Sequence, residues 1–138
     1  GGYYSRAIEL NGKVYVCPAN AQDILEMREI ARQVPIAPSV QEYALKLVLA
    51  THPELDTSPE ISRKYLRFGA SPRAAQAMLS AARVRALNQG RYNVAFDDVR
   101  YVAYATLRHR LALNFEALTA GEKIDGIIGS LLNLLSPR

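Results

Sequence analysis

The chain of 138 residues contains a single cysteine, Cys17, and no tryptophan. One cysteine can form neither an internal disulfide framework nor a Cys-based zinc site. A lone thiol is typical of a reducing compartment, and no apolar run approaches the roughly 20 residues of a membrane span. The first six residues lack the apolar core of a signal peptide. We therefore expect a cytoplasmic protein with no membrane span and, because no methionine precedes Gly1, a domain cut from a longer chain.

The motifs that would mark an enzyme are missing as well. No Gly-rich phosphate loop of the form G-x-x-x-x-G-K-S/T occurs in the sequence. His52 and His109 lie far apart without metal-ligand spacing, so no metal site is expected. No motif places Cys17 or a serine beside a base as an activated nucleophile. The chain is therefore not expected to be an enzyme on its own.

The composition fits one domain with a modest core, since 49% of the residues are hydrophobic and 22% are charged. A net charge of +4 is compatible with nucleic acid, phosphate or an acidic partner without requiring any of them. One alternative is thus a basic helical nucleic-acid-binding module, although its arginines flank several faces and form no single stripe. Another is a plain protein-interaction bundle. The arginines of the first alternative are Arg83, Arg85, Arg91, Arg100, Arg108 and Arg110.

Hydrophobic periodicity divides the chain near residue 20. Residues 7–10 and 13–17 are short β-type runs around Asn11-Gly12, which predicts a hairpin. From Asn20 onward the spacing becomes helical. The predicted domains are an extended or hairpin segment over residues 1–20 and a helical domain over residues 21–138. The predicted fold class is all-α, a small bundle of four to five helices preceded by this short segment.

Helix boundaries follow from caps and breakers. A first helix begins at Asn20, carries the stripe Ile24, Met27, Ala31 and Val34, and ends at Pro35. Capping-box spacing predicts that Ser39 and Glu42 open the second helix, and that Thr119 and Glu122 open the fifth. The fourth should run from Phe96 to about Leu113, with Asp97-Asp98 at the positive end of the helix dipole.

The third helix has the clearest limits, with Ser71 as its cap, Pro72 at its first position and Gly90 just past its end. Arg73 then falls in the first turn, where the dipole disfavours a cation by about 0.3–1 kcal/mol. Two interpretations stay open on physical grounds. Arg73 either serves an anion such as phosphate at a helix N-terminus, or is an exposed residue with good helix propensity.

The stretch from Phe68 to Leu111 resembles the helical lid of MoxR-type AAA+ ATPases. The resemblance rests on an ordered set of short segments, strongest over about 66–113, looser over 21–52 and 119–137, and absent over 1–20. These segments are Gly69 to Ala74, Ala75 to Leu87, Gly90-Arg91, Asp97-Asp98-Val99 and Leu107 to Leu111. One departure is Ala95-Phe96, where the family often has Ser or Thr followed by Pro, and it should weaken the cap of that helix.

The resemblance implies roles for individual residues. Arg73 matches the family's sensor 2 arginine, which reaches from the lid to the γ-phosphate of ATP, and Ser71 and Gly69 shape that helix start. The segment Arg108-His109-Arg110 recurs in the family without a role that the resemblance assigns. It can equally be a basic helix end that complements the dipole.

The resemblance also implies the context in which the chain works. It would be the C-terminal lid that closes over ATP, with ATP and Mg²⁺ held by a core domain absent from this chain. Its partners would be that core, neighbouring AAA+ subunits in a ring homo-oligomer, and a client protein in chaperone-like assembly or maturation. Residues 1–20 would be the join to the core, and nucleic acid would not be a partner.

Overall fold

The computed structural model describes residues 4–10, 12–19 and 21–137. The chain divides into two compact units, one ending at Gln33 and one beginning at Val34. No helix among the described residues is both long enough and apolar enough to cross a membrane. The first unit holds a hairpin and one helix, and the second holds the helical bundle.

The hairpin of the first unit matches the predicted one and is longer. Strand β1 (Tyr4–Leu10) pairs antiparallel with β2 (Lys13–Ala19), with Tyr4 opposite Ala19 and Leu10 opposite Lys13. Gly12 has a φ of 73°, a left-handed conformation that glycine adopts without a Cβ penalty. The predicted turn residue Asn11 and the predicted helix cap Asn20 lie outside the described residues.

Helix α1 (Ala21–Arg32) has the predicted position but buries no residue. Ile24 and Met27 of the predicted apolar stripe are 43% and 60% exposed, whereas Val34, at the start of the second unit, is buried. Helical spacing predicts that apolar side chains share one face, but it does not say what covers that face.

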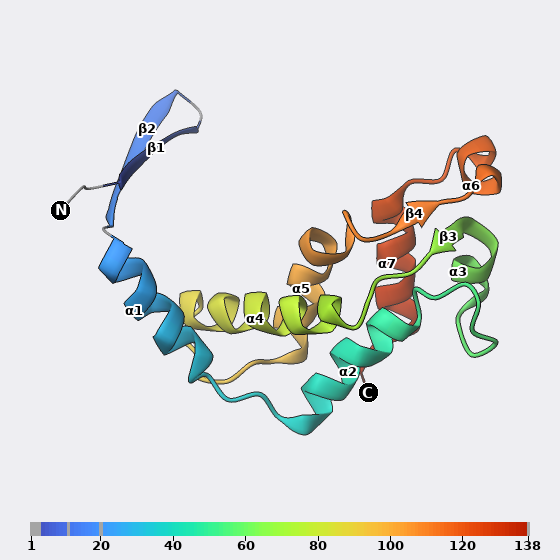
Figure 1. The fold of residues 1–138 in the computed structure, drawn as a ribbon, viewed down its shortest axis with the longest axis horizontal. Helices are drawn as coiled ribbons and strands as arrows, with labels where there is room; N and C mark the ends of the chain where they lie inside the picture. Colours follow the sequence, from blue (N-terminus) through green and yellow to red (C-terminus); the bar gives the residue numbers. More distant parts are fainter. Residues whose placement is uncertain (1–3, 11, 20, 138) are drawn as a thin grey trace. The chain divides into compact units, whose positions relative to one another are not determined.

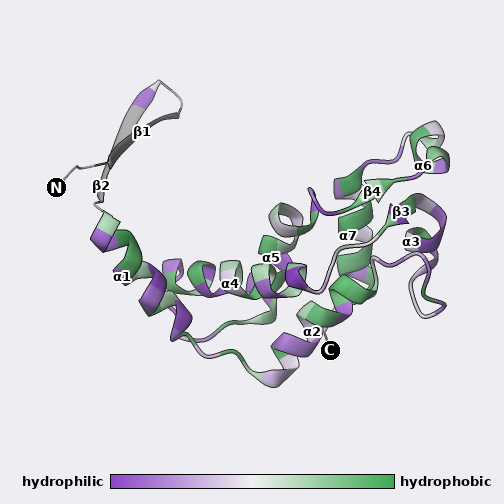
Figure 2. Ribbon diagram, in the orientation of Figure 1, coloured by the Kyte–Doolittle hydropathy of each residue, from purple (hydrophilic) through white to green (hydrophobic). Residues whose placement is uncertain are grey.

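Four helices form the bundle of the second unit: α2 (Pro38–Leu49), α4 (Arg73–Asn88), α5 (Phe96–Leu107) and α7 (Ile124–Leu134). The most extensive packing joins α4 to α5, while α2 contacts both and α7 packs on α5. Apart from Met78, α4 buries only alanines, which lets α5 approach it closely. Figure 2 shows α7 as the most continuously hydrophobic of these helices. The all-α bundle preceded by a hairpin is thereby confirmed, with seven helices among the described residues.

The short elements gather at one end of this unit (Figure 1). They are α3 (Glu60–Tyr65), β3 (Leu66–Phe68), β4 (Ala112–Leu113) and α6 (Phe115–Ala120). Strands β3 and β4 form an antiparallel ladder in which Leu66 faces Leu113. The prediction that the fourth helix continues to about Leu113 was wrong, because α5 ends at Leu107 and the chain turns into this ladder.

Two predicted capping boxes are not formed. Helix α2 begins at Pro38, which suits a first helical position, and its cap residue is Ala37, whose side chain has no hydrogen-bond acceptor. Glu42 instead lies 3.3 Å from the ammonium of Lys46, one turn further along the helix.

The second predicted capping box, Thr119 and Glu122, lies at the end of α6 and not at the start of a helix. The Thr119 hydroxyl donates to the Glu116 carbonyl at 2.9 Å, and Gly121, with a φ of 73°, terminates α6. Helix α7 then begins at Ile124 without a side-chain cap. A glycine in the left-handed region ends a helix more readily than it begins one.

Candidate functional site

Arg73 is the first residue of α4, as the sequence predicts to within one position. Its side chain is exposed and forms no hydrogen bond or ion pair with any other described residue. The backbone preceding it is already helical, since Pro72 has a φ of −55° and a ψ of −26°. The guanidinium therefore projects from a fixed helix start and remains available to a ligand or a partner.

The start of α4 is closed by backbone groups and not by a serine cap. Ala74 N–H donates to the Ser71 carbonyl at 2.8 Å, and Ala75 N–H donates to the Pro72 carbonyl at 3.1 Å. No side-chain cap is formed, so the prediction that Ser71 caps the helix with its side chain was wrong. Because Pro72 itself occupies the cap position, the Ser71 side chain stands one residue too early to serve the first free N–H groups.

Gly69 and Ala70 lie against Thr51 and His52, which follow the C-terminal end of α2. A Cβ at Gly69 would stand 2.7 Å from the Thr51 carbonyl oxygen and 2.9 Å from the His52 nitrogen, so only glycine fits this close approach. Ala70 is buried and donates its N–H to the Thr51 hydroxyl oxygen at 3.0 Å. Thus Gly69, which sequence reasoning assigned to the shape of the helix start, allows this backbone contact.

His52 holds the same segment from the other side. Its Nε2 lies 2.8 Å from the Ala70 carbonyl oxygen, and its Nδ1 lies 2.7 Å from a carboxylate oxygen of Glu54. The backbone hydrogen bond at Glu54, the contact with His52 and the charge of that ring together keep the pKa of the Glu54 carboxyl below its ordinary value. Sequence reasoning considered His52 only as a metal ligand, and no sequence signal predicted this contact.

The segment Arg108-His109-Arg110 is tied to the fold at the end of α5. The Arg108 guanidinium pairs at two points with Asp125 of α7, at 2.8 Å in each contact. Arg110 donates to the Thr106 carbonyl at 2.6 Å, and His109 is exposed. No hydrogen bond or ion pair joins these three residues to Gly69–Arg73 in the described part of the chain.

Asp98 has a role that sequence reasoning missed. It is fully buried and accepts hydrogen bonds from Arg85 at 2.7 Å, from Arg91 at 2.6 and 2.8 Å, and from Ala95 N–H at 2.8 Å. Burial by itself raises the pKa of this carboxyl, but these donors outweigh burial and lower its pKa from 3.8 to about 2. Ala95, where the family often has Ser or Thr, provides no side-chain cap, and Asp98 satisfies its N–H instead.

The arginines of the nucleic-acid alternative are all engaged within the fold. Two of them hold Asp98, and Arg108 holds Asp125. The other three donate to backbone carbonyls. Those three contacts are Arg83 to Val34 at 3.1 Å, Arg100 to Leu132 at 2.7 Å, and Arg110 to Thr106 at 2.6 Å. Each of these guanidinium groups is thus engaged in a contact within the fold.

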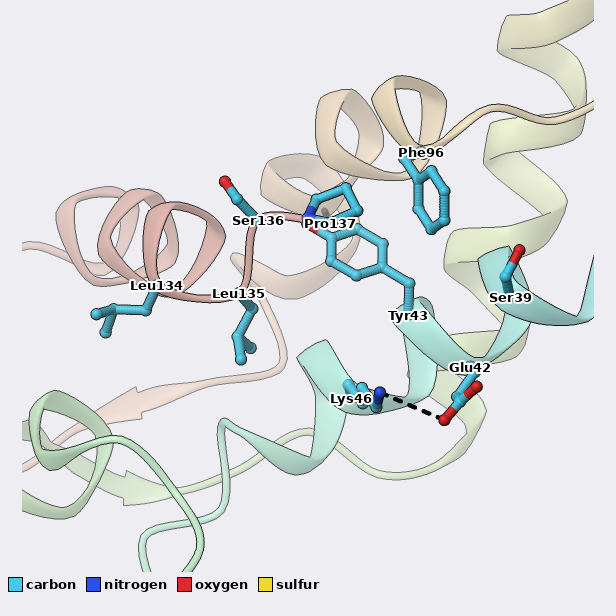
Figure 3. A pocket seen from close by; sticks show the side chains of 9 residues that line it. All are labelled: Ser39, Glu42, Tyr43, Lys46, Phe96, Leu134, Leu135, Ser136 and Pro137. Atoms are coloured by element: carbon cyan, nitrogen blue, oxygen red, sulfur yellow. Dashed lines mark ion pairs between the residues drawn. The ribbon is translucent and has the colours of Figure 1, made fainter.

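A surface pocket of about 410 Å³ lies elsewhere in this unit (Figure 3). It is lined by one face of α2 from Ser39 to Lys46, by Phe96 at the start of α5, and by residues 134–137. The Glu42–Lys46 ion pair lies at its edge, and neither Arg73 nor its neighbours contribute to it. Within the described residues, no three His, Cys, Asp or Glu side chains are grouped as a metal site would require.

Comparison with known proteins agrees with the resemblance seen in the sequence. The family model of the AAA lid domain matches residues 59–128. Chaperone MoxR1 of Mycobacterium tuberculosis is 36% identical over 114 residues, which cover 83% of this chain and 30% of MoxR1. The uncharacterized protein YeaC of Bacillus subtilis is 29% identical over 114 residues, covering 81% of this chain and 32% of YeaC.

A solved structure shares the fold as well. The crystal structure of a Cytophaga hutchinsonii protein, assigned as an ATPase, superposes with a TM-score of 0.76 at 35% identity. The superposition covers 81% of this chain and 34% of that protein. The chain thus spans about a third of the length of each relative that it matches.

The bundle, with Arg73 at the start of α4, is that of an AAA lid, and the chain belongs to the AAA lid domain family. Within that family it is the lid domain of a MoxR-type AAA+ ATPase.

Proposed function

We propose that this lid closes over ATP bound by an ATPase core outside the chain, and that Arg73 contacts the γ-phosphate as the sensor 2 residue. The observation that carries the proposal is the state of Arg73. It is an exposed guanidinium at a helix start, without a partner among the described residues. The arginines considered above for nucleic acid are all engaged within the fold.

Electrostatics explain why a phosphate suits this position. The positive end of the α4 dipole and the Arg73 charge repel each other when no anion is near. A phosphate oxygen placed between them would be attracted by both, and the planar guanidinium can donate two hydrogen bonds to it. Arg73 therefore lowers the stability of the free lid slightly, and the lid would regain this stability when nucleotide is bound.

The contact to phosphate that we propose for this chain is the single one made by Arg73. It has no Gly-rich phosphate loop, and its described residues hold no cluster of acidic groups for Mg²⁺. ATP and Mg²⁺ would be held by the core, where ATP would supply the phosphoryl group that is transferred and Mg²⁺ would neutralise its negative charge. The lid would orient Arg73 and stabilise negative charge on the γ-phosphate while a water molecule attacks it.

The packing of α4 also supports coupling between the nucleotide site and the rest of the ATPase assembly. Helix α4 packs on α2 and α5, so a displacement of its first turn would be shared by the bundle. We propose that the nucleotide state is passed in this way to neighbouring subunits of a ring, and from there to a client protein. MoxR1 is named a chaperone, which is the basis for proposing chaperone-like assembly or maturation here.

The test is ATP turnover by the ATPase that carries this lid. Replacing Arg73 with Ala should lower kcat by roughly tenfold to a thousandfold, less than the largest effects of trans-acting arginine fingers. Arg73→Lys should restore only part of the rate, because an ammonium lacks the planar fork. Wild-type turnover by Arg73→Ala would overturn the proposal.

A further inference from the structure

Both backbone groups of Ala70 are held by two consecutive residues that follow α2. The N–H donates to Thr51 Oγ1 at 3.0 Å, and the carbonyl oxygen lies 2.8 Å from His52 Nε2. Thr51 is fully buried and donates its own hydroxyl proton to the Val48 carbonyl at 2.6 Å. Ala70 stands three residues before Arg73, so this attachment lies next to the proposed phosphate contact.

The two ring nitrogens of His52 both face acceptors. A carbonyl oxygen can only accept, so Nε2 must carry a proton to bond Ala70. The other ring nitrogen, Nδ1, lies 2.7 Å from a carboxyl oxygen of Glu54, whose pKa is lowered chiefly by its backbone hydrogen bond. Two groups face the His52 ring. One is the Ala70 carbonyl, from the segment Gly69–Arg73, and the other is the Glu54 carboxyl, two residues after His52 in the chain. The ring is therefore held between the Ala70 carbonyl and the Glu54 carboxyl, with one nitrogen on each.

We propose that His52 is a positioning residue for Arg73: its ring, held on the other side by Glu54, anchors the Ala70 carbonyl and so fixes the direction in which the first turn of α4 presents the arginine. This inference rests on the proposed function, because it concerns how Arg73 meets phosphate. It adds a residue from outside α4 to the site.

Little freedom remains between Ala70 and Arg73 to absorb a displacement. Pro72 fixes one torsion, and the Ser71 and Pro72 carbonyls accept from Ala74 and Ala75 in the first turn of α4. A rotation of the Ala70 peptide would therefore move the Arg73 guanidinium. A misplacement of about 1 Å costs up to about a hundredfold in a reaction that depends on orientation.

His52 can be removed with less damage than its neighbour Thr51. The His52 side chain is 22% exposed, whereas Thr51 is fully buried and bonded on both sides. Removing the His52 ring leaves the Thr51 contact and the close approach of Gly69 in place. The segment should then stay attached but lose its fixed orientation.

The experiment measures kcat and KM for ATP in the whole ATPase with His52→Ala, His52→Gln, Arg73→Ala and the double variant His52→Ala/Arg73→Ala. We expect His52→Ala to lower kcat about tenfold to a hundredfold with little change in KM. His52→Gln should recover part of the rate, because its amide N–H can donate to Ala70. Gln76→Ala, at an exposed position near the start of α4, controls for general disturbance of the helix.

The double variant separates positioning from a general structural role. If His52 acts through Arg73, its removal should have no further effect on kcat once Arg73 is alanine. An equal loss in both backgrounds would overturn the inference, as would a wild-type rate for His52→Ala when Arg73→Ala is impaired. A wild-type rate for Arg73→Ala would overturn the proposed function, and this inference with it.

The position of the ring proton gives a readout that does not depend on turnover. In nitrogen-15 spectra of the 138-residue chain, Nε2 of His52 should carry a proton, because the Ala70 carbonyl oxygen can only accept. A folded chain in which Nε2 carries no proton would contradict the anchoring mechanism, even if His52→Ala proved too unstable to assay.

Discussion

Arg91 and Asp98 form a two-point ion pair across the turn between α4 and α5, with nitrogen–oxygen distances of 2.6 and 2.8 Å. The carboxylate is fully buried and also holds Arg85 of α4. One acidic side chain thus fastens the end of one helix, the turn after it and the start of the next. Helices α4 and α5 form the most extensive contact of the bundle, so this ion pair orients the helix that carries Arg73.

We predict that Asp98→Asn destabilises the lid by about 3 kcal/mol, because it leaves two arginines without their anion. The estimate is at the low end of the range for buried pairs, since Arg85 and Arg91 keep 24% and 36% of their side-chain surface exposed. Urea unfolding monitored by circular dichroism measures the change. Asp97→Asn, an exposed neighbour in the same turn, should cost only about 0.3–1 kcal/mol. Equal losses for the two variants would refute this account of Asp98.

The same carboxyl should make the lid sensitive to strong acid. Its pKa is lowered from 3.8 to about 2 in the folded chain, where burial acts against the shift and Arg91, the Ala95 N–H and Arg85 produce it. The stabilisation is fully present above the unfolded-state pKa and is lost as pH falls through the folded-state pKa. As the pH is lowered from 3.8 to about 2, the melting temperature of wild type should fall more steeply than that of Asp98→Asn. Parallel curves would show that Asp98 does not carry the effect.

Two glycines should respond in opposite directions to the same substitution. Gly69→Ala places a Cβ 2.7 Å from the Thr51 carbonyl oxygen, a backbone atom, and should cost about 1–3 kcal/mol. Gly126→Ala, in α7, meets no atom within 4 Å and should stabilise the helix by about 0.5–1 kcal/mol. Melting temperatures of the two variants test this, and a stabilised Gly69→Ala protein would argue against the close contact with the Thr51 backbone.

The ion pair between Arg108 and Asp125 should matter little for stability or turnover. Both side chains are about half exposed, so a double-mutant cycle should give a coupling of about 0.2–1 kcal/mol. ATP turnover by Arg108→Ala should stay near wild type, because its guanidinium is engaged with α7 and has no contact with the Gly69–Arg73 segment. A large loss of kcat in a fully folded Arg108→Ala enzyme would give this segment a functional role.

The features that sequence reasoning predicted are those fixed by local chemistry. Pro72 and Gly90 limit α4, which runs from Arg73 to Asn88, and Gly90 has the left-handed φ of 72° expected after a helix end. The order of short segments from Gly69 to Leu111 was enough to predict the lid family. Arg73 was selected because a cation in the first turn conflicts with the dipole, and the structure leaves it exposed.

The features that were missed depend on partners distant in the sequence. His52 contacts a carbonyl 18 residues away, and Arg85 reaches an aspartate 13 residues away, so neither spacing produces a periodic signal. The β3–β4 ladder pairs runs of three and two residues, which are too short for a strand pattern to register. The predicted division at residue 20 and the functional roles of the site residues stay predictions, although Ser71 does not cap α4 with its side chain. Those site residues are Gly69, Ser71, Arg73, Arg108, His109 and Arg110.

The central claim is that Arg73 acts on nucleotide and not on the fold. Its most direct test compares the kcat of the whole ATPase with the melting temperature of the lid for wild type, Arg73→Ala and Arg63→Ala. Arg63 is an exposed arginine on α3 and serves as the matched control. We predict a kcat for Arg73→Ala lower by roughly tenfold to a thousandfold, with lid stability within about 0.5 kcal/mol of wild type, and no change in either quantity for Arg63→Ala. Wild-type kcat in Arg73→Ala, or a loss of kcat that merely follows unfolding of the lid, would contradict the claim.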